Sequence, residues 1–124
     1  MSVIVDGTTY NISVKSLKRK ARFDYKYQEL TADGTMRAEL RGVYLDYELV
    51  FNAYTDYAEY SSLWSKLIQA TEFHEITVPS DTGTYTFDAM LSGIGDEILM
   101  EKSSQNYFHN LTVNFKAQSP EAIP

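Results

Sequence analysis

The sequence predicts a mainly β domain of the α+β kind, an antiparallel β-sandwich or barrel with one flanking amphipathic α-helix at about residues 57–70. Three observations lead to this class. Short apolar–polar alternations recur along the chain, Asp-Gly and similar turn sequences separate them, and one segment has clear helical periodicity. Strands joined by hairpin turns form antiparallel sheets, and a single amphipathic helix covers one face of such a sheet.

The chain length of 124 residues predicts one domain. We expect a single β-sandwich domain over residues 1–118, followed by a flexible tail over residues 119–124, which contains two of the three prolines. The absence of cysteine excludes disulfides, thiolate catalysis and cysteine-ligated metals. The N-terminus lacks the pattern of a signal peptide, and no apolar run is long enough for a spanning helix. We therefore expect no membrane association.

The N-terminal residues predict a hairpin. Val3–Val5 and Thr8–Val14 are β-prone, and Asp6-Gly7 between them supplies two positive φ angles for a tight turn. A second Asp-Gly turn lies within Thr31–Thr35. Between these turns the chain alternates strictly, which predicts a strand with one face in the core. The apolar positions of that face are Ala21, Phe23, Tyr25 and Tyr27.

Basic residues concentrate on this same strand. We call them the basic stripe: Lys15, Lys18, Arg19, Lys20, Arg22 and Lys26. With Asp24 the window carries six basic and one acidic residue, a formal charge of +5, whereas the rest of the chain has five basic and sixteen acidic residues, a charge of −11. The stripe is read either as the solvated face of a strand or as a docking patch for an acidic surface. An acidic body disfavours nucleic acid, so no specific nucleic-acid binding is expected.

A long strand is expected from Met36 to Phe51, with Gly42 marking a bulge or bend. A strand of this length bends or projects beyond its sheet. One face carries Val43, Leu45, Tyr47, Leu49 and Phe51, and the other carries Tyr44, Asp46, Glu48 and Asn52.

The helix is expected to begin after Asp56 as N-cap, with Glu59 completing a capping box. Its apolar stripe consists of Tyr60, Leu63, Trp64, Leu67 and Ile68. The remaining elements are a hairpin of Phe73–Val78 and Thr84–Leu91 around Pro79–Gly83, a break at Ser92–Asp96, a short strand at Glu97–Glu101, a loop at Lys102–Asn106 and a last strand at Tyr107–Ala117. In that last strand Leu111, Val113, Phe115 and Ala117 share the apolar face.

The residues that carry chemistry form no catalytic or metal-binding motif. His74 and His109 lack the spacing of a metal site, and His74 is interpreted as a half-buried packing residue. Asp46 and Glu48 lie on one strand face, where paired carboxylates suit glycosidase chemistry, but a solvated face or a partnership with Arg and Lys on the next strand is favoured. No nucleophile, base and oxyanion stabiliser assemble, so we expect a protein that is not an enzyme, with no catalytic residue, cofactor or metal.

The ten tyrosines are numerous for this length. Those on apolar strand faces are expected in the core: Tyr25, Tyr27, Tyr47 and Tyr85. Others are expected at the surface: Tyr10, Tyr44, Tyr54 and Tyr107. Exposed tyrosine is typical of protein interfaces and sugar platforms, which keeps open the alternative of a monomeric β-sandwich binding module for a carbohydrate or a protein. Trp64, on the apolar helix stripe, is expected to be buried, which argues against a sugar platform.

Several segments together resemble a family. They are the strand and turn Val5–Tyr10, the basic segment Ser16–Lys20, the strand Arg41–Tyr47, the helix Tyr57–Leu67 and the ending Asn110–Ala117. Taken together, these resemble the short structural proteins of long-tailed phages and prophages of Gram-positive gut bacteria, and the order of strands, one helix and more strands is similar to the tail-tube fold.

This resemblance implies a tail or baseplate protein of the virion, assembled in the host cytoplasm. It would form a ring, such as a hexamer, and contact other tail proteins as a tube, tip or connector component. The long strand would extend into a neighbour, and the acidic body would suit a lumen that DNA passes without sticking. On this reading the candidate assembly interface is Lys15, Lys18, Arg19, Lys20, Arg22, Lys26, Tyr44, Asp46 and Glu48.

Overall fold

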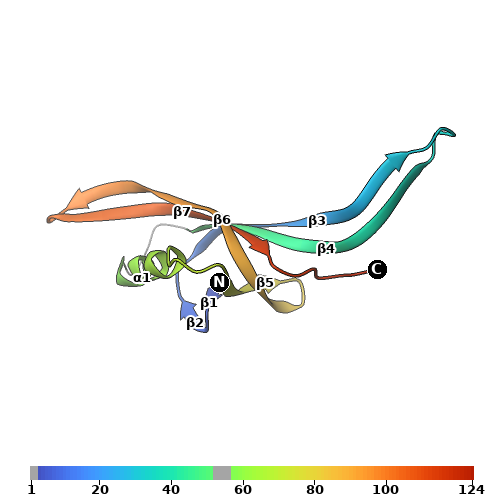
Figure 1. The fold of residues 1–124 in the computed structure, drawn as a ribbon. Coiled ribbons are helices and arrows are strands. Elements are labelled where there is room, and N and C mark those ends of the chain that lie inside the picture. The colour runs from blue at the N-terminus through green and yellow to red at the C-terminus, as the bar shows by residue number, and fades with distance from the viewer. Residues whose placement is uncertain (1–2, 52–56) are drawn as a thin grey trace.

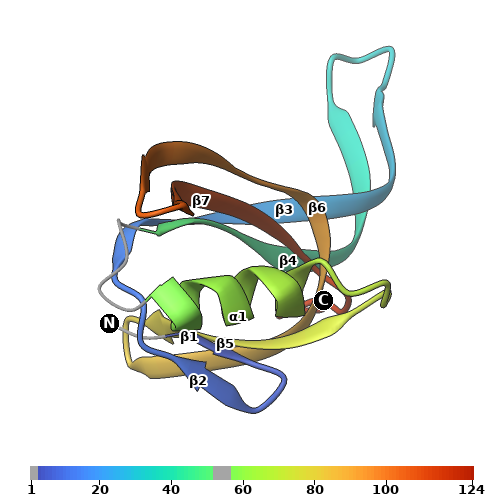
Figure 2. The ribbon, with the colours of Figure 1, turned by 90° about the vertical axis from the view of Figure 1, so that its left-hand side faces the viewer.

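The computed structural model describes residues 3–51 and 57–124 and confirms a mainly β fold with a single helix in the described part. Its elements are β1 (Val3–Val5), β2 (Thr8–Tyr10), β3 (Val14–Leu30), β4 (Met36–Phe51), α1 (Tyr57–Leu67), β5 (His74–Ser80), β6 (Gly83–Lys102) and β7 (Gln105–Ala117). The strands form one antiparallel sheet in the order β2-β1-β5-β6-β7-β4-β3. The sheet curves so that its two ends face each other, and α1 lies across the open side (Figure 2).

The core lies between the curved sheet and α1. The expected apolar faces of β4 and β7 are confirmed there, because alternate residues of both strands are buried: Tyr47, Leu49, Phe51, Leu111, Val113, Phe115 and Ala117. The helix contributes three buried side chains, Tyr60, Leu63 and Leu67. Burial of these large side chains is the main favourable term that holds the helix on the sheet.

The first hairpin is confirmed, with Asp6 and Gly7 at φ angles of 49° and 83°. Both angles lie in the left-handed region that a two-residue hairpin turn requires and that Asp-Gly adopts readily. The second strand ends at Tyr10, earlier than the predicted Val14. Tyr10 is only 6% exposed, so its expected place at the surface is wrong.

The helix is shorter than predicted, because it ends at Leu67. Ile68 is 52% exposed and lies outside the core, which corrects the apolar stripe. The Oε1 atom of Glu59 accepts a hydrogen bond from the Asn11 N–H at 2.5 Å and ties α1 to the chain after β2. The proposed N-cap, Asp56, lies outside the described residues.

The expected break at Ser92–Asp96 is wrong, because β6 runs without interruption over twenty residues. The sheet absorbs the irregular sequence as register shifts against β7, between Leu91 and Gly93 and between Gly95 and Glu97. Bulges of this kind bend a strand without ending it. The loop after β6 is correspondingly tight, with Ser103 and Ser104 both at positive φ.

Two hairpins project from opposite sides of the body, β3–β4 on one side and β6–β7 on the other (Figure 1). The predicted bounds of β4 are confirmed, as is its projection beyond the sheet. We call residues 25–41, which lie beyond the paired residues Asp24 and Gly42, the arm. The expected burial of the β3 face is wrong at three aromatic positions: Phe23, Tyr25 and Tyr27 are 55%, 37% and 46% exposed.

The C-terminal segment lies against the base of the arm. The Val43 N–H donates to the Ala122 carbonyl at 2.9 Å, and the Glu121 N–H donates to the Val43 carbonyl at 2.8 Å. Gly42 makes this approach possible, since a Cβ atom there would lie 2.8 Å from Cβ of Pro120. The expected bulge is present, because the register shifts between Asp24, paired with Gly42, and the next pair.

Substitution of Gly42 by alanine is expected to lower the free energy of unfolding by about 1–2 kcal/mol in the full chain, because the added methyl displaces Pro120. In a chain that ends at Gln118 the same substitution removes no contact. There it is expected to be neutral or to stabilise slightly, since alanine has less backbone entropy to lose. Urea unfolding of the four chains measures both effects, and an equal cost in the two lengths contradicts the packing argument.

Candidate functional site

The arm is a two-stranded hairpin that the body does not support. Among the described residues β3 pairs with β4 alone, and β4 pairs with β7 only over Tyr47–Val50. Beyond that, the one backbone bridge reaching β4 is Val43 to Ala122. An isolated two-stranded hairpin is only marginally stable in water. Within the part of the chain that the structure describes, the arm therefore lacks the third strand or apolar cover that holds such hairpins in place.

The arm exposes apolar side chains along its length. Leu30 and Met36, which face each other across the arm's tip, are 67% and 60% exposed. Tyr25 stacks on Phe23 at a ring-centroid separation of 6.5 Å, and both rings remain exposed. Contiguous exposed apolar surface marks an interaction site in folded proteins.

The β6–β7 hairpin has a similar character at the other side of the molecule. Ile98, Leu99 and Met100 are consecutive, and their exposed fractions are 56%, 44% and 46%. The register against β7 shifts between Ile98 and Met100, so Leu99 is the extra residue of a bulge that adds to this exposed apolar patch. The patch differs from expectation, because the sequence predicts only a short strand at Glu97–Glu101.

The structure places the basic stripe along β3, with five members next to the body and Lys26 on the arm. Three of its members are paired within the chain: Arg19 Nη2 lies 2.9 Å from Asp81, Arg22 Nε lies 3.0 Å from Asp46, and Lys26 Nζ lies 3.9 Å from Glu39. In the described residues the other three, Lys15, Lys18 and Lys20, form no ion pair. The free cations of the stripe are therefore these three lysines.

Asp46 has a structural role in the sheet. Its Oδ2 atom accepts the Arg22 Nε–H, and its Oδ1 atom accepts the backbone N–H of Ala117 at 3.1 Å, where the β4–β7 ladder has just ended. The Arg22 guanidinium in turn lies 4.4 Å from the centroid of the Tyr44 ring. This arrangement confirms the interpretation of Asp46 as a partner for a basic residue on the next strand.

Glu48 lies directly opposite Lys18 on the same sheet face, as Asp46 lies opposite Lys20. Together with Asn114 and Lys116 of β7, these residues line an open hollow with a volume of about 500 Å³. The structure thus brings most of the candidate interface together on one face. Tyr44 and Arg22 continue this face toward the arm, whereas Arg19 lies on the opposite face, beside Tyr47.

His74 is fully buried rather than half-buried, and it has a partner that the sequence did not reveal. Its Nδ1 atom lies 2.6 Å from Oδ2 of Asp6, and Lys66 Nζ lies 3.6 Å from the same carboxylate. The Glu75 N–H donates to the other oxygen of Asp6 at 2.8 Å. The turn of the first hairpin is thereby fixed to β5. Sixty-eight residues separate Asp6 from His74, so no local pattern indicates this pair.

Partial burial acts to raise the pKa of Asp6, but the hydrogen bonds from His74 and Glu75, with the charges of His74 and Lys66, outweigh it and lower that pKa below 3.8. The stabilisation is therefore present above pH 3.8 and is lost as the pH falls through the lowered value. The variant Asp6→Asn, which retains a residue suited to positive φ, is expected to lose about 1–2 kcal/mol of unfolding free energy at pH 7.

Urea unfolding at several pH values measures this difference, which should vanish in strong acid. The control is Asp88→Asn, because Asp88 is exposed and its side chain has no partner among the described residues. A loss for Asp6→Asn that persists unchanged in acid contradicts the charge argument.

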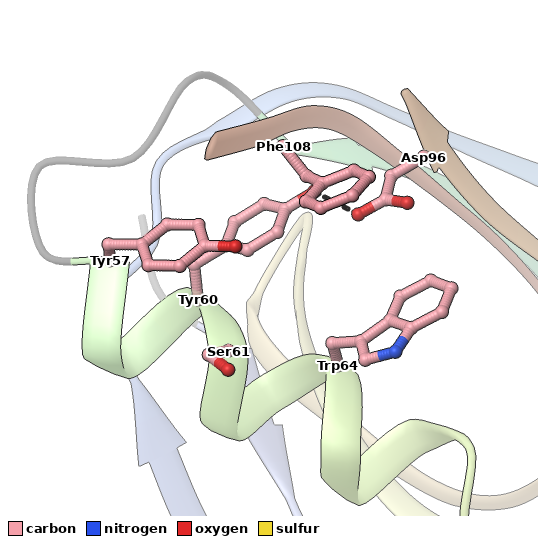
Figure 3. Close-up of a pocket in the computed structure, with 6 residues that line it drawn as sticks. All are labelled: Tyr57, Tyr60, Ser61, Trp64, Asp96 and Phe108. Carbon is pink, nitrogen blue, oxygen red and sulfur yellow. Dashed lines mark hydrogen bonds between the residues drawn. The ribbon is translucent and has the colours of Figure 1, made fainter. Parts of the chain in front are cut away.

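An aromatic pocket lies beside α1, opposite in character to the polar hollow. Its lining residues are Tyr57, Tyr60, Ser61, Trp64, Asp96 and Phe108, and its volume is about 170 Å³ (Figure 3). Trp64 is partly buried and lines this pocket, instead of lying in the core as the apolar stripe predicts. Helical spacing indicates that Tyr57, Tyr60 and Trp64 share a face, but nothing in the sequence places Asp96 and Phe108 opposite them.

In residues 3–51 and 57–124, no group of three metal-ligating side chains is placed to hold an ion. The helix in this part of the chain is too short to cross a membrane. Comparisons with protein-family models, curated proteins and solved structures gave no match to this chain.

Proposed function

We propose that this chain is a non-enzymatic structural subunit that assembles with copies of itself into a ring. The observation that carries the proposal is the arm, a two-stranded hairpin with exposed Leu30 and Met36 at its tip and no cover from residues 3–51 and 57–124. Packing on a neighbouring subunit would bury these side chains and supply the missing support.

The positions of the two apolar hairpins favour a ring over a two-fold dimer. They extend from opposite sides of the body (Figure 1). Two different surfaces on opposite sides suit a head-to-tail contact, which closes into a ring when the rotation between subunits allows it. The free lysines of the basic stripe and the acidic remainder of the chain add complementary charge to such a contact.

The virion is the proposed setting, as a tail tube, tail-tip or connector component, and it rests on the resemblance to short phage tail proteins described above. The proposed assembly is a ring, such as a hexamer, that contacts other tail proteins and has no catalytic role. Neither nucleic acid nor membrane is a proposed partner.

Light scattering over a range of protein concentrations tests the proposal. We expect a mass that rises from the 14.2 kDa monomer to a defined multiple. If the mass decreases with added salt, the contact between subunits depends mainly on the basic stripe. If the mass does not change with salt, that contact depends mainly on the apolar arm. A monomer at every concentration contradicts self-assembly and favours the alternative, a monomeric binding module.

A further inference from the structure

The aromatic pocket is large enough for a small organic group but not for a whole drug-sized ligand. Its volume of about 170 Å³ is below the roughly 300–1,000 Å³ of sites for drug-sized ligands. All of its lining residues belong to one chain and lie outside the arm, so a ligand there does not depend on the proposed assembly.

The walls of the pocket present aromatic rings from two elements. Tyr57, Tyr60 and Trp64 come from successive turns of α1, and Phe108 comes from β7. Tyr57 and Tyr60 are stacked with ring centroids 5.9 Å apart. The faces of such rings carry negative charge density and attract a cation within about 6 Å.

A carboxylate completes the site. Asp96 lies at the same end of the pocket as Trp64 (Figure 3), and its Oδ2 atom accepts the Tyr60 hydroxyl at 2.8 Å. Burial raises the pKa of Tyr60, and the hydrogen bond and charge of Asp96 raise it further, so Tyr60 stays a neutral donor. The other oxygen of Asp96 receives no hydrogen bond from the described residues. A negative charge therefore faces an aromatic cavity.

We propose that this pocket binds a quaternary ammonium group, of the trimethylammonium type. A primary ammonium has three N–H donors that need acceptors. Among the lining residues Asp96 is the one charged acceptor, and the others are the neutral hydroxyls of Tyr57, Tyr60 and Ser61 on walls that are mainly aromatic. A methylated ammonium has no donor to satisfy and presents apolar methyl groups to the rings. The N-terminus of α1, at Tyr57, carries the positive end of the helix dipole and disfavours a cation nearby. The favoured position for the cation is therefore the other end of the pocket, between Trp64 and Asp96 (Figure 3).

Trp64 reports on the site directly, because it is the single tryptophan of the chain. We expect choline to change its fluorescence in a saturable manner at millimolar concentrations, with sodium chloride as the ionic-strength control. The neutral isostere 3,3-dimethylbutan-1-ol and the primary amine ethanolamine are expected to bind at least about fivefold more weakly. Phosphocholine then distinguishes two sources of the trimethylammonium group. If it binds as well as choline, the natural ligand is the head group of a larger molecule; if it binds more weakly than choline, the natural ligand is a free cation.

Two matched variants test the role of the carboxylate. Asp96→Asn keeps an acceptor for the Tyr60 hydroxyl and is expected to weaken choline binding about fivefold or more. Glu97→Gln removes the same charge from the next residue, whose side chain is 64% exposed and does not line the pocket, and should change binding less than about twofold.

Equal binding of choline and its neutral isostere overturns the proposal, as does the absence of a saturable change in the parent chain. Both of these readouts use the unaltered protein, so they remain decisive if a variant folds poorly. Equal effects of the two charge substitutions also overturn it, because they show general electrostatics rather than a site at Asp96.

Discussion

A chain without the arm is expected to stay a folded monomer at concentrations where the full chain assembles. Replacing residues 25–41 by Asn-Gly joins Asp24 directly to its partner Gly42 through a two-residue turn. The core remains intact, because no buried side chain of the core belongs to the arm. Light scattering should show loss of the multimer, and circular dichroism should show a retained β fold.

Point substitutions refine this test. Replacing Leu30 and Met36 together by serine removes the exposed apolar pair at the tip and should raise the concentration needed for assembly at least about tenfold. The control is Gln28→Ser on the same strand, which changes a polar, exposed residue and should leave assembly unchanged. Undiminished assembly of the arm-deleted chain would place the contact elsewhere in the molecule.

Truncation of Leu63 to alanine is expected to have the largest effect on stability, about 2–5 kcal/mol of unfolding free energy. Leu63 has no exposed surface, and its side chain lies on the face of α1 that packs against the core of the sheet. Its truncation therefore leaves a cavity and removes apolar contacts. Chemical denaturation followed by Trp64 fluorescence and by circular dichroism measures the loss.

The matched control is Ile68→Ala, five residues after Leu63 and just past the end of the helix. Ile68 is 52% exposed, so the same kind of truncation should cost less than about 1 kcal/mol. Similar losses at Leu63 and Ile68 would show that α1 is not packed on the core as described.

The part of the fold that the sequence predicts well is the part where local rules and burial agree. The alternation of β4 and β7 matches their buried faces, and Asp6-Gly7 forms the expected turn. In both cases a single strand or turn contains all the information needed, because period-two alternation and positive φ angles are local properties.

The errors occur where alternation continues without burial, or where a strand continues without alternation. Tyr25 and Tyr27 alternate with charged residues as core positions do, yet they lie on the arm, which no other described element covers. Conversely, the glycines of β6 break the alternation without ending the strand, because β7 pairs across the bulges. Tertiary pairing decides both outcomes, and no local pattern contains it.

The candidate sites differ in the same way. The members of the basic stripe lie close together in sequence, and so do Asp46 and Glu48. Each group lies on one strand, the stripe on β3 and the two carboxylates on β4. The aromatic pocket is assembled from α1, β6 and β7, and its carboxylate lies thirty-six residues from the tyrosine it contacts. A site built from three separated segments leaves no spacing to recognise.

The place of β7 in the sheet has a consequence for biosynthesis. In the described residues it is the strand that joins β3 and β4 to the half formed by β6, β5, β1 and β2. Ribosomes add about 5–20 residues each second, so the stretch from the end of β4 to the start of β7 takes roughly 3–10 s to make. Throughout that interval the β3–β4 hairpin has been synthesised without its neighbour in the sheet, and this seven-stranded sheet is complete only after β7 has left the ribosome.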